Sequence, residues 1–127
     1  MATILVIDDD SMMRGMIRDM LESKGHEIEE AETSEEGVAK FLHLRPALVI
    51  TDLFIPLRGG LEIIKDIIAE DKEAKIIAIS GMELSGFGFR QDTDPKEIAK
   101  QNGARYAFKK PFGQEEFFEA VTELLGD

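Results

Sequence analysis

Short apolar runs alternate along the chain with longer segments in which apolar residues recur at helical spacing. Runs of β-type residues are predicted as strands near residues 4–7, 27–31, 48–50, 76–79 and 104–108, and the first, third and fourth are rich in isoleucine, valine and leucine. A helical pattern follows each of them. Strands that alternate with helices in this way predict an α/β fold, in which helices cover a doubly wound five-stranded parallel sheet.

The predicted helices are marked by turn residues and by apolar stripes. Asp10 or Ser11 is expected to cap the first helix and Gly25 to end it, and residues 33–36 form a capping box for the second. The stripes expected to face the core are Met13, Ile17, Met20 and Leu21; Val38, Phe41 and Leu42; Leu61, Ile64, Ile67 and Ile68; and Phe117, Phe118, Val121, Leu124 and Leu125. Met12 and Met16 are also read as packing residues.

Two segments depart from this regular alternation. Residues 27–31 are short and acidic, as an edge strand that must avoid pairing with other chains would be. Residues 82–93 have no hydrophobic period and are predicted as a long mobile loop, after which Asp94 and Pro95 start another helix as cap and first-turn proline. The loop is the part of the chain whose role the pattern leaves open.

Composition narrows the function. The chain has 127 residues, enough for one domain, and its 15 basic and 26 acidic residues give a net charge of -11. That charge argues against binding to nucleic acid or to an anionic membrane. There is no cysteine, no charged leader and no apolar run near the ~20 residues of a membrane helix. We therefore expect a cytoplasmic protein.

The third predicted strand delivers an aspartate to the place where ligands bind in such folds. The apolar run 48–50 reads as a strand buried on both faces, and Asp52 follows it just before the chain breaks at Pro56. In open parallel sheets, ligands gather in the crevice beyond the carboxyl ends of the strands. We therefore predict that Asp52 is the working residue.

Further carboxylates follow the first strand. Asp8, Asp9 and Asp10 come directly after it, so at least two of them are expected near Asp52. Carboxylates ~4 Å apart repel one another by about 4 kcal/mol at an effective dielectric near 20, and a divalent cation would relieve this. Oxygen ligands without histidine or thiolate suit Mg²⁺, with Mn²⁺ as a substitute. Asp10 is equally well explained as a helix cap.

A carboxylate held in line with a phosphorus atom can accept a phosphoryl group when its charge is neutralised. Ser80, after the fourth strand, has a hydroxyl to donate to a phosphoryl oxygen, and Lys110, after the fifth, has a flexible positive charge. A cis bond at Pro111 costs only about 0.5 to 1 kcal/mol and would aim Lys110 inward. Phosphoryl transfer is therefore the predicted chemistry.

Together these residues resemble the receiver domain of two-component response regulators, of the CheY-like single-domain kind. The resemblance covers Ile4 to Leu125, and it rests on Asp8 and Asp9, Asp52 with Pro56 and Gly60, Ser80, and Lys110 with Pro111 and Phe112. It implies a flavodoxin-like strand order of 2-1-3-4-5, with residues 1–127 as one receiver domain. It also implies that Asp52 is the phosphoacceptor.

The same resemblance assigns the remaining site residues. It implies that Asp9, Asp52 and the carbonyl of Phe54 bind Mg²⁺ directly, with Asp8 acting largely through water. It further implies that Ser80, Gly81 and Lys110 contact the phosphoryl oxygens. One departure stands out, because the position that often holds a switch tyrosine or phenylalanine is Ala107 here.

By resemblance, a sensor histidine kinase or a phosphotransfer protein donates the phosphoryl group. The chain then signals to a separate protein through a conformational change, either as a monomer or as a phosphorylation-dependent dimer. It is a switch rather than an enzyme, because it catalyses only its own phosphorylation and dephosphorylation. The identities of the kinase and the target are not encoded in any motif.

Three other functions were weighed. A haloacid-dehalogenase-type phosphatase would use Asp8 as its nucleophile, but that leaves Asp52 unexplained and lacks room for a cap. A flavodoxin-like carrier would need a first loop that accepts the phosphate of FMN, which three aspartates would repel. A pseudo-receiver that binds a partner without being phosphorylated is the third alternative, and the complete residue set argues against it.

Overall fold

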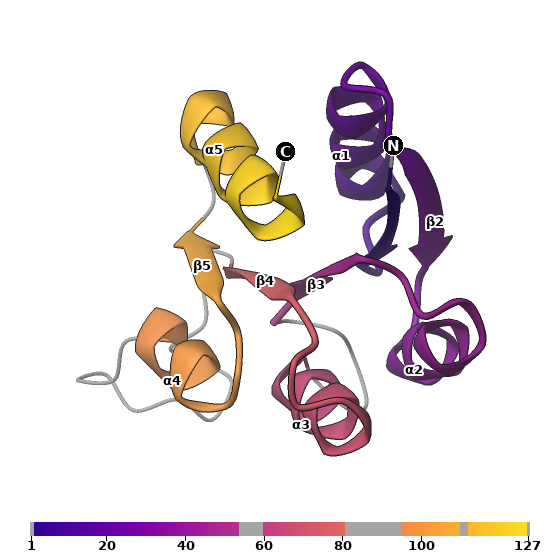
Figure 1. Cartoon of the computed structure of the whole chain (residues 1–127), viewed down its shortest axis with the longest axis vertical. Helices are drawn as coiled ribbons and strands as arrows, with labels where there is room; N and C mark the ends of the chain where they lie inside the picture. The colour runs from indigo at the N-terminus through magenta and orange to yellow at the C-terminus, as the bar shows by residue number, and fades with distance from the viewer. Residues whose placement is uncertain (1, 54–59, 81–94, 110–111, 127) are drawn as a thin grey trace.

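Strands and helices alternate along the whole chain, as the hydrophobic pattern predicts (Figure 1). The computed structural model describes residues 2–53, 60–80, 95–109 and 112–126. The elements are β1 (Thr3–Ile7), α1 (Ser11–Glu22), β2 (Glu27–Ala31), α2 (Ser34–Leu44), β3 (Leu48–Asp52), α3 (Gly60–Glu70), β4 (Ile76–Ser80), α4 (Pro95–Gln101), β5 (Tyr106–Lys109) and α5 (Gln114–Leu125). No helix among these residues is long and apolar enough to span a bilayer.

The five strands form one parallel sheet in the order β2-β1-β3-β4-β5, which confirms the predicted fold. The acidic strand β2 lies at an edge, as expected. The last strand begins at Tyr106 rather than at residue 104. The cause is that the amide of Ala104 donates to the carbonyl of Ala99 in α4, 3.0 Å away, and so closes that helix instead of joining the sheet.

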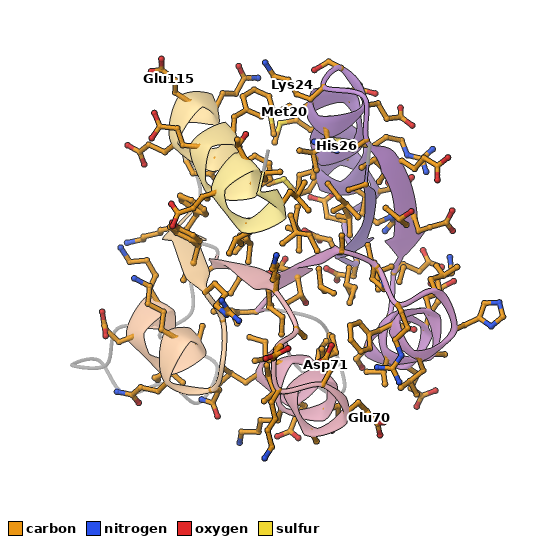
Figure 2. The ribbon with its side chains drawn as sticks, in the orientation of Figure 1. Met20, Lys24, His26, Glu70, Asp71 and Glu115 are labelled. Atoms are coloured by element: carbon orange, nitrogen blue, oxygen red, sulfur yellow. The ribbon has the colours of Figure 1, made fainter. Side chains whose placement is uncertain are left out.

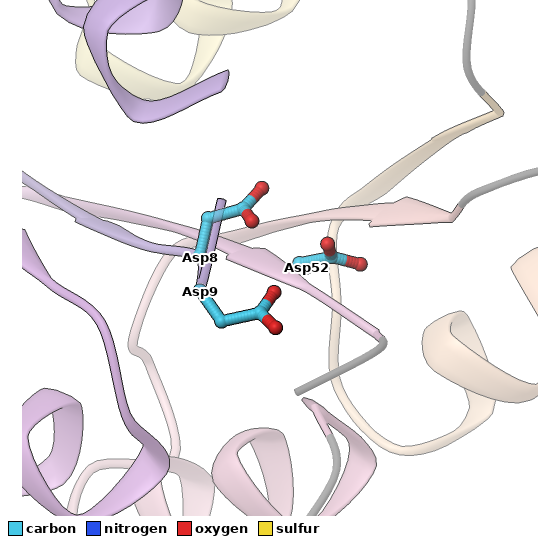
Figure 3. Close-up of side chains that lie close together, drawn as sticks. All are labelled: Asp8, Asp9 and Asp52. Carbon is cyan, nitrogen blue, oxygen red and sulfur yellow. The ribbon is translucent and has the colours of Figure 1, made fainter. Parts of the chain in front are cut away.

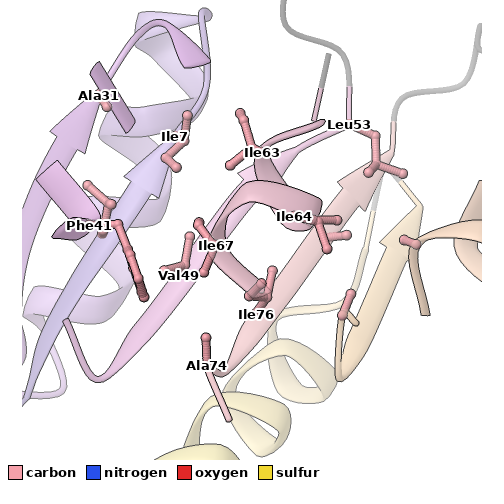
Figure 4. Close-up of a cluster of buried hydrophobic side chains, with 14 residues drawn as sticks. Ile7, Ala31, Phe41, Val49, Leu53, Ile63, Ile64, Ile67, Ala74 and Ile76 are labelled. Carbon is pink, nitrogen blue, oxygen red and sulfur yellow. The ribbon is translucent and has the colours of Figure 1, made fainter. Parts of the chain in front are cut away.

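Helices cover both faces of the sheet, with α1 and α5 on one side and α2, α3 and α4 on the other (Figure 1). In β1, Leu5 and Ile7 pack toward α2 and α3, while Ile4 and Val6 pack toward α1 and α5, and all four are fully buried. Figure 4 shows the first of these two cores, between the sheet and α2 and α3. Because the inner strands are buried on both faces, they read as continuous apolar runs.

Local side-chain hydrogen bonds cap the N-termini of α1 and α2. Asp10 caps α1, since its carboxylate accepts from the amide of Met12 at 2.9 Å. Thr33 caps α2 and accepts from the amide of Glu36 at 3.1 Å. The Glu36 carboxylate reaches back to the amide of Glu32, one residue earlier than in a standard capping box. Helix α1 ends at Glu22, before the predicted stop at residue 25.

The packing predictions for three side chains are wrong. Met12 is 83% exposed, and Met16 and Leu42 are also exposed. The buried stripe of α1 runs through Ile17, Met20 and Leu21. At 100° per residue, Met16 lies about 100° and Met12 about 140° around the helix from Ile17. In α2, Phe41 takes the inward position next to Leu42. The expected loop at residues 82–93 and the cap at Asp94 lie outside the described residues.

Aromatic rings and one lysine side chain pack against α5. The rings of Phe112 and Phe117 lie 5.2 Å apart between centroids, and Phe117 is fully buried against the sheet. Lys24, labelled in Figure 2, lies in the turn after α1. Its ammonium is 4.8 Å from the centre of the Phe118 ring. This contact joins the two helices that cover the same face of the sheet.

Two glycines inside helices give a matched test of the core. A Cβ at Gly37 would lie 2.6 Å from Cδ1 and 3.0 Å from Cγ1 of the buried Ile7, whereas a Cβ at Gly15 would meet nothing within 4 Å. Alanine in place of glycine gains about 1 kcal/mol of helix stability. We expect Gly15→Ala to raise the free energy of unfolding by that amount. In Gly37→Ala an overpacking cost of about 1 to 3 kcal/mol should offset the same gain. Urea unfolding measures both, and equal stability of the two variants would contradict the described packing.

Candidate functional site

Three carboxylates converge at the carboxyl ends of β1 and β3. Asp52 is the last residue of β3, and Asp8 and Asp9 follow β1 directly. The parallel register pairs Ile7 with Thr51, so the two strands end side by side. One carboxylate oxygen from each aspartate lies within 4.8 Å of the others, and the three side chains face a common space (Figure 3). This confirms the expectation that at least two of the first-strand aspartates lie near Asp52.

The three aspartates differ in their contact with water. Asp8 is 2% exposed and Asp52 is 5% exposed, whereas Asp9 is exposed. Burying carboxylates next to one another is costly unless other groups or a cation compensate their charge. Three carboxylate donors without histidine or cysteine suit a hard divalent cation such as Mg²⁺, and the exposed Asp9 leaves the cluster open to solvent on one side. The residues present therefore fit such an ion.

The position of Asp8 is fixed by its own backbone and by the residues around it. Its amide donates to the carbonyl of Ala31 at 3.0 Å, which extends the pairing of β1 with β2 by one residue. Its carboxylate accepts from the amide of Asp10 at 2.9 Å. Asp10 itself caps α1 and is not part of the carboxylate cluster, so the structure resolves its two possible roles in favour of the cap.

Ser80 lies at the same edge of the sheet as the aspartates. It ends β4 and is 3% exposed, and the register pairs Asp52 with Ile79, the residue before Ser80. The predicted placement of Ser80 at the carboxyl end of β4 therefore holds. The other residues assigned by resemblance, Phe54, Gly81, Lys110 and Pro111, lie outside the described residues, and their roles remain predictions.

Arg14 is a contact of the site that the sequence analysis missed. Its guanidinium, in α1, donates from Nη1 to the backbone carbonyl of Asp8 at 2.7 Å. A basic residue in the second turn of a helix is common on solvated faces, so only its spacing of six residues from Asp8 hinted at this contact. The bond depends on how α1 packs beside β1.

The aromatic side chains of β5 lie on the opposite face of the sheet from Ala107. Ala107 packs with the core under α2, α3 and α4, while Tyr106 and Phe108 pack with the core under α1 and α5. The rings of Tyr106 and Phe108 are stacked, with centroids 6.3 Å apart. The hydroxyl of Tyr106 donates to the carboxylate of Glu123 in α5. The contacts of Tyr106 and Phe108 therefore lie on the α5 side of the sheet.

Comparisons of the sequence and of the structure with known proteins point to the same family. The profile of the response regulator receiver domain matches residues 4–122. Protein CcdB of Bacillus subtilis is 34% identical over 127 residues, covering 99% of both chains. Chemotaxis protein CheY of Thermotoga maritima is 31% identical, covering 95% of both chains. A response regulator receiver domain protein from Clostridium thermocellum is similar in structure, with a TM-score of 0.87 and 26% identity, covering 99% of this chain and 95% of its own.

The carboxylate cluster predicts an unusual effect of charge removal. Asp9→Asn should raise the free energy of unfolding by about 1 kcal/mol in EDTA, because it removes repulsion that solvent only partly screens. Added Mg²⁺ should then stabilise the wild type but not the variant. Urea unfolding with and without Mg²⁺ measures both effects. Asp10→Asn is the control, since it removes the same charge outside the cluster and keeps a good cap; a less stable Asp9→Asn protein in EDTA would contradict this interpretation.

A second prediction concerns Tyr106. Its hydrogen bond to Glu123 raises the pKa of the phenol above its usual value of 10.0, and partial burial and the nearby negative charge act in the same direction. The stabilisation from this bond is therefore present below about pH 10 and is lost as the pH rises through the raised pKa. Tyr106 is the only tyrosine and there is no tryptophan, so ultraviolet absorbance of the phenolate reports this group alone. Glu123→Gln should lower the midpoint, and an unchanged midpoint would count against the bond.

Proposed function

The chain belongs to the response regulator receiver domain family, and on that premise we propose that it is a phosphorylatable signalling switch. Residues 1–127 form one receiver domain that accepts a phosphoryl group on Asp52. The donor is a phosphohistidine on a sensor histidine kinase or on a phosphotransfer protein. The phosphorylated chain signals to a separate protein through altered conformation. A cytoplasmic location remains a prediction from the sequence.

The observation that carries this proposal is the convergence of Asp8, Asp9 and Asp52 within 4.8 Å. Three like charges at the ends of two buried strands do not stabilise the fold, because each one adds repulsion. A divalent cation explains the arrangement. Asp9, Asp52 and the carbonyl of Phe54 are the proposed direct ligands of Mg²⁺, with Mn²⁺ as a substitute, and Asp8 acts mainly through water.

The proposed chemistry is transfer between a nitrogen and an oxygen. A carboxylate oxygen of Asp52 attacks the phosphorus, the P–N bond breaks, and its electron pair returns to the imidazole of the donor. Asp52 then carries an acyl phosphate. A bound cation would draw negative charge from the phosphoryl oxygens. Ser80, Gly81 and Lys110 are the proposed donors to these oxygens, with a cis bond at Pro111 aiming Lys110.

Family membership and the carboxylate cluster argue against the phosphatase and against the carrier of FMN. A phosphatase that used Asp8 as its nucleophile would leave Asp52 without a role, although Asp52 shares the cluster. A carrier of FMN would need to hold a phosphate where the three carboxylates now lie. Relatives of the same family differ in length, and the chain spans 47% of the transcriptional regulatory protein ResD of Bacillus subtilis. The downstream target is therefore left open.

Intact-protein mass spectrometry after incubation with acetyl phosphate tests the proposal. We expect the wild type to gain the mass of one phosphoryl group with Mg²⁺ and not with EDTA. Asp52→Asn should gain none, because an amide is not a nucleophile toward phosphorus. Asp10→Asn is the matched control and should be phosphorylated like the wild type. No adduct on a wild type that binds Mg²⁺ normally would instead favour the pseudo-receiver.

A further inference from the structure

Each nitrogen of the Arg14 side chain contacts a different residue. Nη1 donates to the carbonyl of Asp8 at 2.7 Å, and Nε donates to Glu30 at 2.9 Å. Nη2 lies 3.8 Å from the carboxylate of Glu32. The side chain is only 13% exposed. Because the guanidinium is planar and rigid, these contacts together fix the direction of the bond to Asp8.

Glu30 is in turn held from several sides. Its carboxylate accepts from Arg14 through one oxygen and lies 2.9 Å from Nε of Arg18 through the other. Its backbone carbonyl accepts from the ammonium of Lys40 in α2 at 2.5 Å. Glu30 therefore anchors Arg14 to the edge strand β2. With Glu32, it also offsets the charge of the guanidinium, which would otherwise oppose a cation at the nearby cluster.

The carbonyl of Asp8 is the group through which Arg14 acts on the site. This carbonyl belongs to the peptide unit that joins Asp8 to Asp9, and that unit is planar. The amide of Asp8, which belongs to the preceding peptide unit, is held by Ala31 in β2. Holding the oxygen as well fixes the rotation of the following peptide plane relative to the preceding one. That rotation sets the direction in which the chain enters Asp9, and with it the placement of the Asp9 carboxylate.

We propose that Arg14 is a positioning residue for the divalent cation site. It holds the peptide between Asp8 and Asp9 in the orientation in which their carboxylates converge with Asp52. The inference rests on the proposed function, since the cation site is part of it. It attributes part of the cation affinity of the site to Arg14, which is not itself a ligand.

Arg18 provides a matched control. It pairs with the same Glu30 carboxylate and also donates to a backbone carbonyl, that of Ile28 at 3.0 Å. Both of these contacts are with β2 and leave the peptide of Asp8 untouched. Arg14 and Arg18 therefore share a helix, a charge and an ion-pair partner. They differ in the carbonyl that each one holds, in the contact of Arg14 with Glu32, and in exposure, which is 13% for Arg14 and 37% for Arg18.

The test compares Arg14→Lys with Arg18→Lys, because lysine keeps the charge but loses the rigid fork. The dissociation constant for Mn²⁺ is measured by calorimetry on each protein, at a temperature at which circular dichroism shows it to be folded. Amide hydrogen exchange at Asp9 and Asp10 is measured in EDTA, where no cation contributes. Arg14→Gln is made in parallel and replaces Arg14→Lys in the comparison if that variant does not fold.

We expect Arg14→Lys to weaken Mn²⁺ binding about tenfold, as substitutions of residues that orient metal ligands do, and to speed exchange at both amides. Arg18→Lys should leave both within about twofold of the wild type. Equal losses in the two variants would overturn the inference, because they would indicate a general effect of the ion pairs. So would unchanged binding in Arg14→Lys. A wild type that binds no Mn²⁺ would overturn the proposed cation site itself, which distinguishes the two failures.

Discussion

The parallel register of β1 and β3 is the constraint on which the rest of the site depends. The two strands lie side by side at the centre of the sheet and end at the same level, so the last residue of β3 and the residues that follow β1 must meet. Those residues are aspartates, and their repulsion acts against the packing of the strands. The apolar residues of both strands, buried on both faces of the sheet, supply the stabilisation that opposes this repulsion.

The site is held by a second set of contacts around the first strand. Asp8 is fixed through its amide by β2, through its carboxylate by the amide of Asp10, and through its carbonyl by Arg14. One partner comes from β2, and the other two come from α1 and its cap. Contacts that hold Asp8 in place reduce the rearrangement that cation binding would need, and the proposed phosphoryl-transfer site would benefit from such preorganisation.

The two faces of the sheet differ in how they connect the site to the surface. On the side of α5, rings from β5 and α5 pack together, and Tyr106 is tied to Glu123. On the side of α4, β5 presents Ala107, a small side chain, where many family members have an aromatic ring. Alanine has no ring, so the rotation of an aromatic side chain at this position cannot be part of the proposed switch.

The sequence alone determined the alternation of elements, the burial of the inner strands and the aspartates that end them. These features depend on local period and on residues adjacent in the chain, which a pattern can express. It also assigned the roles of Phe54, Gly81, Lys110 and Pro111, which stay predictions. Only the tertiary structure decided that Met12 and Met16 face solvent, that Asp10 serves as a cap and that Arg14 reaches Asp8. The cap at Asp10 is a local contact with the amide of Met12, two residues along the chain. The exposure of Met12 and Met16 and the reach of Arg14 instead depend on the rotation of α1 about its own axis against the sheet, a property of packing that no short stretch of sequence specifies.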